Sequence, residues 1–97
     1  MATLYITEFL PRSTGTFQVA VIPPVAEQTI AIGISSVASA AFNSNTGLVR
    51  LCCDSPCSVA WGLAPIASST TCRLPANGVE YFNVSSPGMK VAVITNN

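Results

Sequence analysis

Four cysteines are the only side chains in this sequence whose type and spacing could form a chemical site. The sequence contains no histidine, and its four carboxylates, Glu8, Glu27, Asp54 and Glu80, stand far apart along the chain. General acid–base and nucleophilic catalysis usually need a group that titrates near neutral pH or a closely placed pair of carboxylates. We therefore predict that the protein is not an enzyme and has no catalytic residues.

The cysteines, Cys52, Cys53, Cys57 and Cys72, allow three interpretations. Structural zinc is usually held by C-x2–4-C pairs; Cys53 and Cys57 fit this spacing loosely, whereas Cys72 stands alone and Cys52 points to the opposite face of its strand. A disulfide could join Cys53 to Cys57, or Cys52 to Cys72. The third interpretation is that all four are free and act as small apolar residues within strands. We favour the third, because the cytosol keeps thiols reduced, and we expect neither a metal nor another cofactor.

The composition indicates one small domain, spanning residues 1–97, with a surface poor in charge. Hydrophobic residues make up 49% of the chain and charged residues 8%, and the charges sum to zero. Soluble domains usually contain about 25% charged residues. Four isolated cations cannot neutralise a phosphate backbone, so we expect no nucleic-acid partner. A surface with so little charge is expected to be partly hidden in a homo-oligomer, for which we favour a trimer over a dimer.

Neither export nor membrane insertion is expected from the sequence. The N-terminus, MATLYITEFL, has no basic region and alternates polar with apolar residues, unlike a signal peptide, so we expect the chain to start in the cytosol. The most apolar stretch, 29–42, is interrupted by serines and a glycine and is too short to span a bilayer.

Apolar and polar residues alternate with a period of two along most of the chain, which predicts β-strands. The first run places Leu4, Ile6 and Glu8 on one face, and a later run places Val79 and Tyr81 opposite Phe82. We expect an all-β fold: a single small β-sandwich, either jelly-roll or immunoglobulin-like, with about seven or eight short antiparallel strands. The strands are expected at 3–9, 17–21, 30–34, 37–42, 48–53, 57–61, 71–74, 79–84 and 90–95.

Turn residues and aromatic residues give three further expectations. The segments 48–53 and 57–61 flank Asp54-Ser55-Pro56 and are predicted to form a hairpin, and 75–78 is predicted to be a turn. Trp61 could form a sugar-stacking platform with Tyr5 and Tyr81, which keeps a lectin-like role open. A single tryptophan within a strand pattern more often belongs to the core, and we predict this for Trp61.

Several segments resemble a family of small proteins encoded beside the structural genes of tailed bacteriophages. They are LYITEF, PPVAEQTIAIG, SAAFN, VRL, CSVAWG, RLPAN, EYFNV and PGMKVAVI. Members of this family with an assigned role resemble head-decoration or minor capsid proteins. The resemblance implies a structural virion protein, made in the host cytoplasm, that binds the major capsid protein on the outer surface of the capsid and reinforces the shell.

Two other functions stay open: a tail or baseplate accessory module, and a carbohydrate- or host-factor-binding domain. The weakly charged segments 9–16 and 22–28 are candidate contact arms, because loops often carry binding residues. The alternative is that they only connect strands. The candidate partner-binding residues are Phe9, Arg12, Phe17, Pro23 and Pro24.

Overall fold

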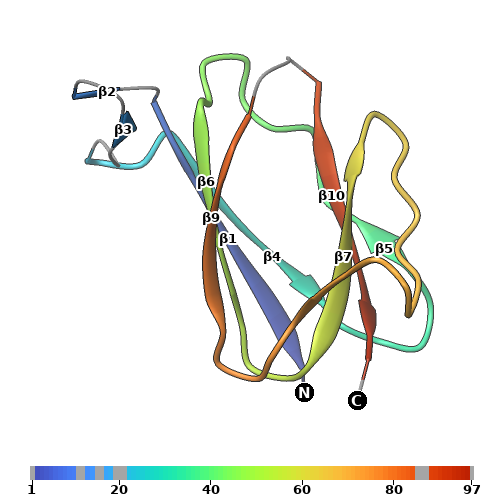
Figure 1. The fold of residues 1–97 in the computed structure, drawn as a ribbon. Helices are drawn as coiled ribbons and strands as arrows, with labels where there is room; N and C mark the ends of the chain where they lie inside the picture. The colour runs from blue at the N-terminus through green and yellow to red at the C-terminus, as the bar shows by residue number, and fades with distance from the viewer. Residues whose placement is uncertain (1, 11–12, 15–16, 19–21, 85–87, 97) are drawn as a thin grey trace.

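The computed structural model describes residues 2–10, 13–14, 17–18, 22–84 and 88–96, and in these residues two four-stranded antiparallel sheets face each other (Figure 1). The first sheet has the order β4 (Ala26–Ala31), β1 (Thr3–Phe9), β6 (Leu48–Cys53), β9 (Val79–Asn83). The second sheet has the order β5 (Val37–Ala38), β10 (Lys90–Thr95), β7 (Cys57–Gly62), β8 (Cys72–Leu74). A short hairpin joins β2 (Ser13–Thr14) to β3 (Phe17–Gln18). The predicted all-β sandwich is confirmed.

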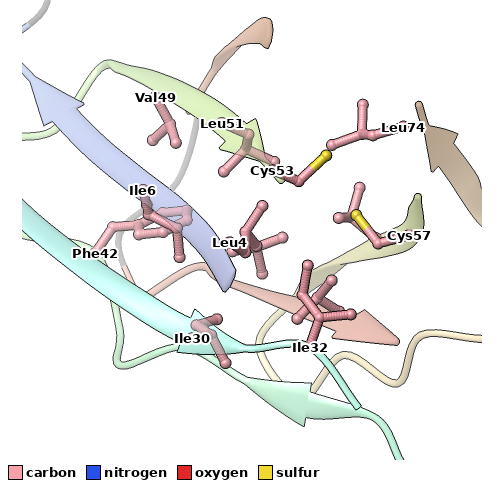
Figure 2. Close-up of a cluster of buried hydrophobic side chains, with 13 residues drawn as sticks. Leu4, Ile6, Ile30, Ile32, Phe42, Val49, Leu51, Cys53, Cys57 and Leu74 are labelled. Carbon is pink, nitrogen blue, oxygen red and sulfur yellow. The ribbon is translucent and has the colours of Figure 1, made fainter. Parts of the chain in front are cut away.

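Apolar side chains from both sheets meet in one core (Figure 2). Leu4 and Ile6 from β1 and Val49 and Leu51 from β6 are almost completely buried in it. The second sheet contributes Val59, Val91, Val93 and Leu74. Each such side chain stabilises the fold by roughly 1.5–3 kcal/mol when it leaves water. The described residues form no helix, and none of them could therefore cross a membrane as one.

Most connections between strands cross from one sheet to the other. From β4 to β10 every connection passes from one sheet to the other, except that β7 and β8 are neighbours in the second sheet. The predicted hairpin between β6 and β7 is wrong, since these strands lie in different sheets. The turn between them is held from both sides: Thr3 N–H donates to Asp54 Oδ1 (2.7 Å), and Asn96 N–H donates to Pro56 O (3.2 Å).

Other strands begin or end away from their predicted limits. The strand expected at 30–34 begins earlier, at Ala26, and ends at Ala31, which leaves Ile34 exposed. The strand expected at 37–42 is reduced to Val37–Ala38. Of the strand expected at 17–21, only β3 is seen, and residues 19–21 lie outside the described part of the chain. The segment 9–16, predicted to be a loop, contains the short strand β2.

The predicted turn at 75–78 is confirmed and links β8 to β9. Gly78 N–H donates to Pro75 O (2.9 Å), and Asn77 adopts a left-handed conformation with φ of 61°. A side chain at Gly78 would place its Cβ 2.8 Å from Pro75 O, so only glycine fits there without a shift.

Glu8 occupies the core face of β1, as the alternation predicts, and is buried although it is charged. Its Oε1 accepts hydrogen bonds from Asn43 N–H (2.7 Å) and Thr46 Oγ1–H (2.7 Å), and its Oε2 accepts a longer one from Gln28 Nε2 (3.4 Å). A buried carboxylate is tolerated when donors compensate for lost hydration. Glu8 therefore fastens the 43–46 turn to β1.

We expect Glu8→Ala to lower the free energy of unfolding by about 3 kcal/mol, because it leaves the donors at Asn43 and Thr46 without their acceptor. Glu8→Gln keeps an oxygen that can accept both hydrogen bonds and is expected to cost less than half as much. Urea unfolding followed by Trp61 fluorescence measures both. A loss below about 0.5 kcal/mol for Glu8→Ala would show that the hydrogen bonds to the carboxylate do not hold the turn.

Candidate binding surface

The outer face of the second sheet is covered by the chain itself. Ser58 and Ala92 point away from the core, yet both are fully buried. The 63–71 connection lies over this side of the sheet (Figure 1): Ala67 is buried, and its N–H donates to Ser36 Oγ (2.9 Å). Asn96 Nδ2 donates both to Ser58 Oγ (2.7 Å) and to Ser69 O (3.2 Å), which fastens the connection to the sheet.

The outer face of the first sheet is open and carries two tyrosines. The strand registers place its outward side chains in two rows, Thr29–Tyr5–Cys52–Val79 and Glu27–Thr7–Arg50–Tyr81. Tyr5 is 46% exposed, Tyr81 55% and Val79 39%. Tyrosine on a rigid strand loses little conformational entropy when a partner covers it, and it offers both apolar area and a hydrogen-bonding group. We name this surface the tyrosine face.

A shallow groove of about 470 Å³ crosses the tyrosine face over β4, β1 and β6. Its outward side chains combine one aromatic ring, three hydroxyls, one thiol and one charge of each sign. They are Tyr5, Thr7, Thr29, Cys52, Glu27 and Arg50. Glu27 and Arg50 lie in the same row, on either side of Thr7. The groove can therefore bind a partner through apolar contact, through hydrogen bonds and through a charge of either sign.

The predicted partner-binding residues do not form this surface. Phe9 is buried, at 6% exposed, as is its register partner Leu48, although the alternation directs both outward. Pro23 is exposed and Pro24 half-buried, both before β4. Phe17 is the first residue of β3, and Arg12 lies outside the described residues. Phe9 is thus buried in the chain by itself, and the partner-binding role of these residues stays a prediction.

Trp61 belongs to the edge of the core, as predicted. Its ring packs against Phe82, with centroids 4.6 Å apart, and against Phe42 at 6.3 Å. These rings border a small apolar cavity of about 200 Å³ between the sheets. Trp61 lies in the second sheet, and the tyrosine face belongs to the first, so the three aromatic residues do not form one sugar-stacking platform.

All four cysteines carry free thiols in the structure. Cys53 and Cys57 enter the core from opposite sheets (Figure 2), and Cys53 Sγ donates to Pro75 O (3.1 Å). Cys52 faces outward from the first sheet whereas Cys72 lies in the second, so a disulfide between these two does not fit the fold. Among the described residues, no three His, Cys, Asp or Glu side chains are placed to hold a metal ion.

Burial raises the pKa of the Cys57 thiol from 9.0 to about 12; the neighbouring Cys53 and Cys72 add to the rise, and Arg73 opposes it. Because the unfolded chain loses this proton at a lower pH than the folded one, the stabilisation is complete below pH 9 and is lost as the pH rises to 12.

We expect the free energy of unfolding of the wild type to fall more steeply than that of Cys57→Ala above pH 9, by up to about 1.4 kcal/mol per pH unit. Urea titrations of both proteins at pH 8, 9 and 10, with a reductant present, measure the two slopes. The two proteins differ only at position 57, so the difference in slope reports on the Cys57 thiol together with its coupling to Cys53 and Cys72. Parallel slopes would show that Cys57 loses its proton as easily in the fold as in the unfolded chain.

No protein-family model, no curated protein and no solved structure matches this chain. A β-sandwich hosts many unrelated functions, so the fold alone does not name one. A function can therefore be inferred only from the residues of the structure, above all those of the tyrosine face.

Proposed function

We propose that this protein is a structural virion component, a capsid-decoration protein whose tyrosine face binds the outer surface of the shell formed by the major capsid protein. The observation that carries the proposal is the open tyrosine face, on which Tyr5 of β1 and both Val79 and Tyr81 of β9 are exposed. Interfaces between proteins are enriched in such aromatic residues and depleted of charge at their centre.

The chemistry of the remaining side chains supports a binding role. Glu8, the one acidic residue buried in the described chain, is occupied by hydrogen bonds that hold a turn. Low overall charge suits a protein that ends in an assembly. A decoration protein needs a stable fold and an adhesive surface, and repeated copies on a shell add weak contacts through multivalency. The sequence resemblance to phage head-decoration proteins points to the capsid as the partner.

The test uses shells assembled from the major capsid protein encoded with this chain. Wild-type protein is expected to sediment with the shells, and Tyr5→Lys to raise the Kd at least tenfold, because it places a charge at the centre of the contact. Ile34→Lys is the matched control: Ile34 is 89% exposed but lies in the β4–β5 connection, outside the tyrosine face, and its substitution is expected to leave the Kd unchanged. Wild-type protein that stays in the supernatant, and is missing from purified virions, would refute the proposal.

A second candidate function follows from the groove. Tyr5 flanked by Thr29, Glu27 and Arg50 offers a ring and hydrogen-bonding groups of the kind that sugars contact. A glycan array with wild type and Tyr5→Ala distinguishes the two functions: glycan binding that Tyr5→Ala abolishes, without shell binding, favours a carbohydrate-binding domain. A tail or baseplate module would use the same face, and labelling the protein in intact particles locates it on the head or the tail.

A further inference from the structure

Strand β9 forms one border of the first sheet and leaves one edge open. It pairs only with β6, with Leu51 opposite Glu80. Cys53 N–H donates to Gly78 O and Val84 N–H donates to Gly47 O, one at each end of this ladder. Residues in an antiparallel strand point their backbone groups alternately to either side. The even-numbered residues 78–84 therefore bond to β6, and the N–H and C=O groups of Val79, Tyr81 and Asn83 point to the open edge, where no described residue bonds them.

The other sheet borders differ from β9. Along β4, the Gln28 amide accepts from Ala40 N–H (3.1 Å) and donates to Ala40 O (3.4 Å), so the 39–42 segment runs beside this edge. Strand β5 has two residues and β8 has three, including Arg73. Natural proteins protect edges by covering them, by shortening them or by charging them. Strand β9 has five residues, no proline and one charge, Glu80.

We propose that β9 pairs antiparallel with β9 of a second copy of this chain, about a two-fold axis at Tyr81. The pairing joins the two first sheets into one continuous sheet and the two tyrosine faces into one surface. It concerns self-association and does not rest on capsid binding.

The sequence of β9 is compatible with antiparallel pairing to the same strand of a second copy. The two-fold axis sets Tyr81 opposite Tyr81 of the second copy, and Val79 opposite Asn83. These are the residues whose backbone groups point to the open edge. The two-fold axis generates three such pairs, because Val79 and Asn83 pair twice, and each pair exchanges two hydrogen bonds, about six in all. Glu80 falls opposite Phe82, so that like charges do not face each other directly. Paired tyrosines across two strands stabilise a sheet further.

Such a dimer buries less surface than a standard protein interface, so we expect it to form at roughly 10–100 µM and to dissociate on dilution. Copies held side by side on a larger assembly would pair more readily, because their effective concentration is higher.

The test compares wild type, Tyr81→Pro and Tyr5→Lys between about 5 µM and 1 mM, with a reductant so that the exposed Cys72 cannot link chains. Proline is tolerated in an edge strand where its N–H would face solvent, so Tyr81→Pro keeps every bond to β6 and removes the central donor of the dimer. Light scattering is expected to show dimer at high concentration for wild type and for Tyr5→Lys, whose substitution lies on the interior strand β1, and monomer for Tyr81→Pro.

Amide hydrogen exchange gives the residue-level readout. In wild type, the amides of Val79, Tyr81 and Asn83 are expected to gain about fivefold to ninefold protection between the lowest and the highest concentration, as a dimerisation constant of roughly 10–100 µM implies. Those of Glu80 and Phe82, already bonded to β6, are expected to change little. Should Tyr81→Pro fail to fold, Tyr81→Asp places two carboxylates at the axis and is expected to abolish the dimer.

A monomer at 1 mM, or a dimer that survives Tyr81→Pro or Tyr81→Asp, would overturn the pairing. Loss of shell binding with the dimer intact would refute only the proposed function. Shell binding by a strictly monomeric wild type would refute only the β9 pairing.

Discussion

A β-sandwich has four sheet faces, and a chain of this length covers three of them. Two faces are buried against each other by alternating apolar residues, among them Leu4, Leu51 and Val93. The third is covered by the 63–71 connection, whose contacts with Ser36 and Asn96 leave Ser58 and Ala92 buried. The fourth stays open, because no described segment crosses it. The position of the open face is thus a consequence of where the 63–71 connection lies.

The chain has few charges, and its single buried carboxylate, that of Glu8, has a structural role. Glu8 accepts from donors of the 43–46 turn at the end of β1 where the inward row of apolar residues stops. Hydrogen bonds to a buried carboxylate are directional, so they fix the turn more specifically than apolar contact would. The oxygens of Glu8 are thus occupied by hydrogen bonds within the fold, and the charged side chains of the open face are Glu27 and Arg50.

The alternation of residues predicts most strands and their inward faces, including Glu8 beside Leu4 and Ile6, because that pattern is local. It could not predict that β6 and β7 separate, since Asp54-Ser55-Pro56 suits a hairpin as well as a crossing between sheets. Hydrogen bonds from two residues that are distant in the sequence, Thr3 and Asn96, hold this turn where the chain crosses between the sheets. The tyrosine face also escapes prediction, because Tyr5 and Tyr81 meet on one surface only through the register of β1, β6 and β9. For Phe9 the pattern is misleading in the opposite sense: the alternation directs its side chain outward, yet the side chain is buried.

The open face and the open edge belong to the same sheet, and this follows from the strand order. Strand β9 is the last strand of the first sheet in the sequence and pairs only with β6, so it forms a border of the sheet, with Tyr81 and Val79 directed outward. Residues that expose their side chains on the face therefore also direct their backbone groups to the edge. A partner that extends the sheet at β9 enlarges the face without altering any contact in the core. Binding through the face and growth at the edge can thus strengthen each other without competing for the same atoms.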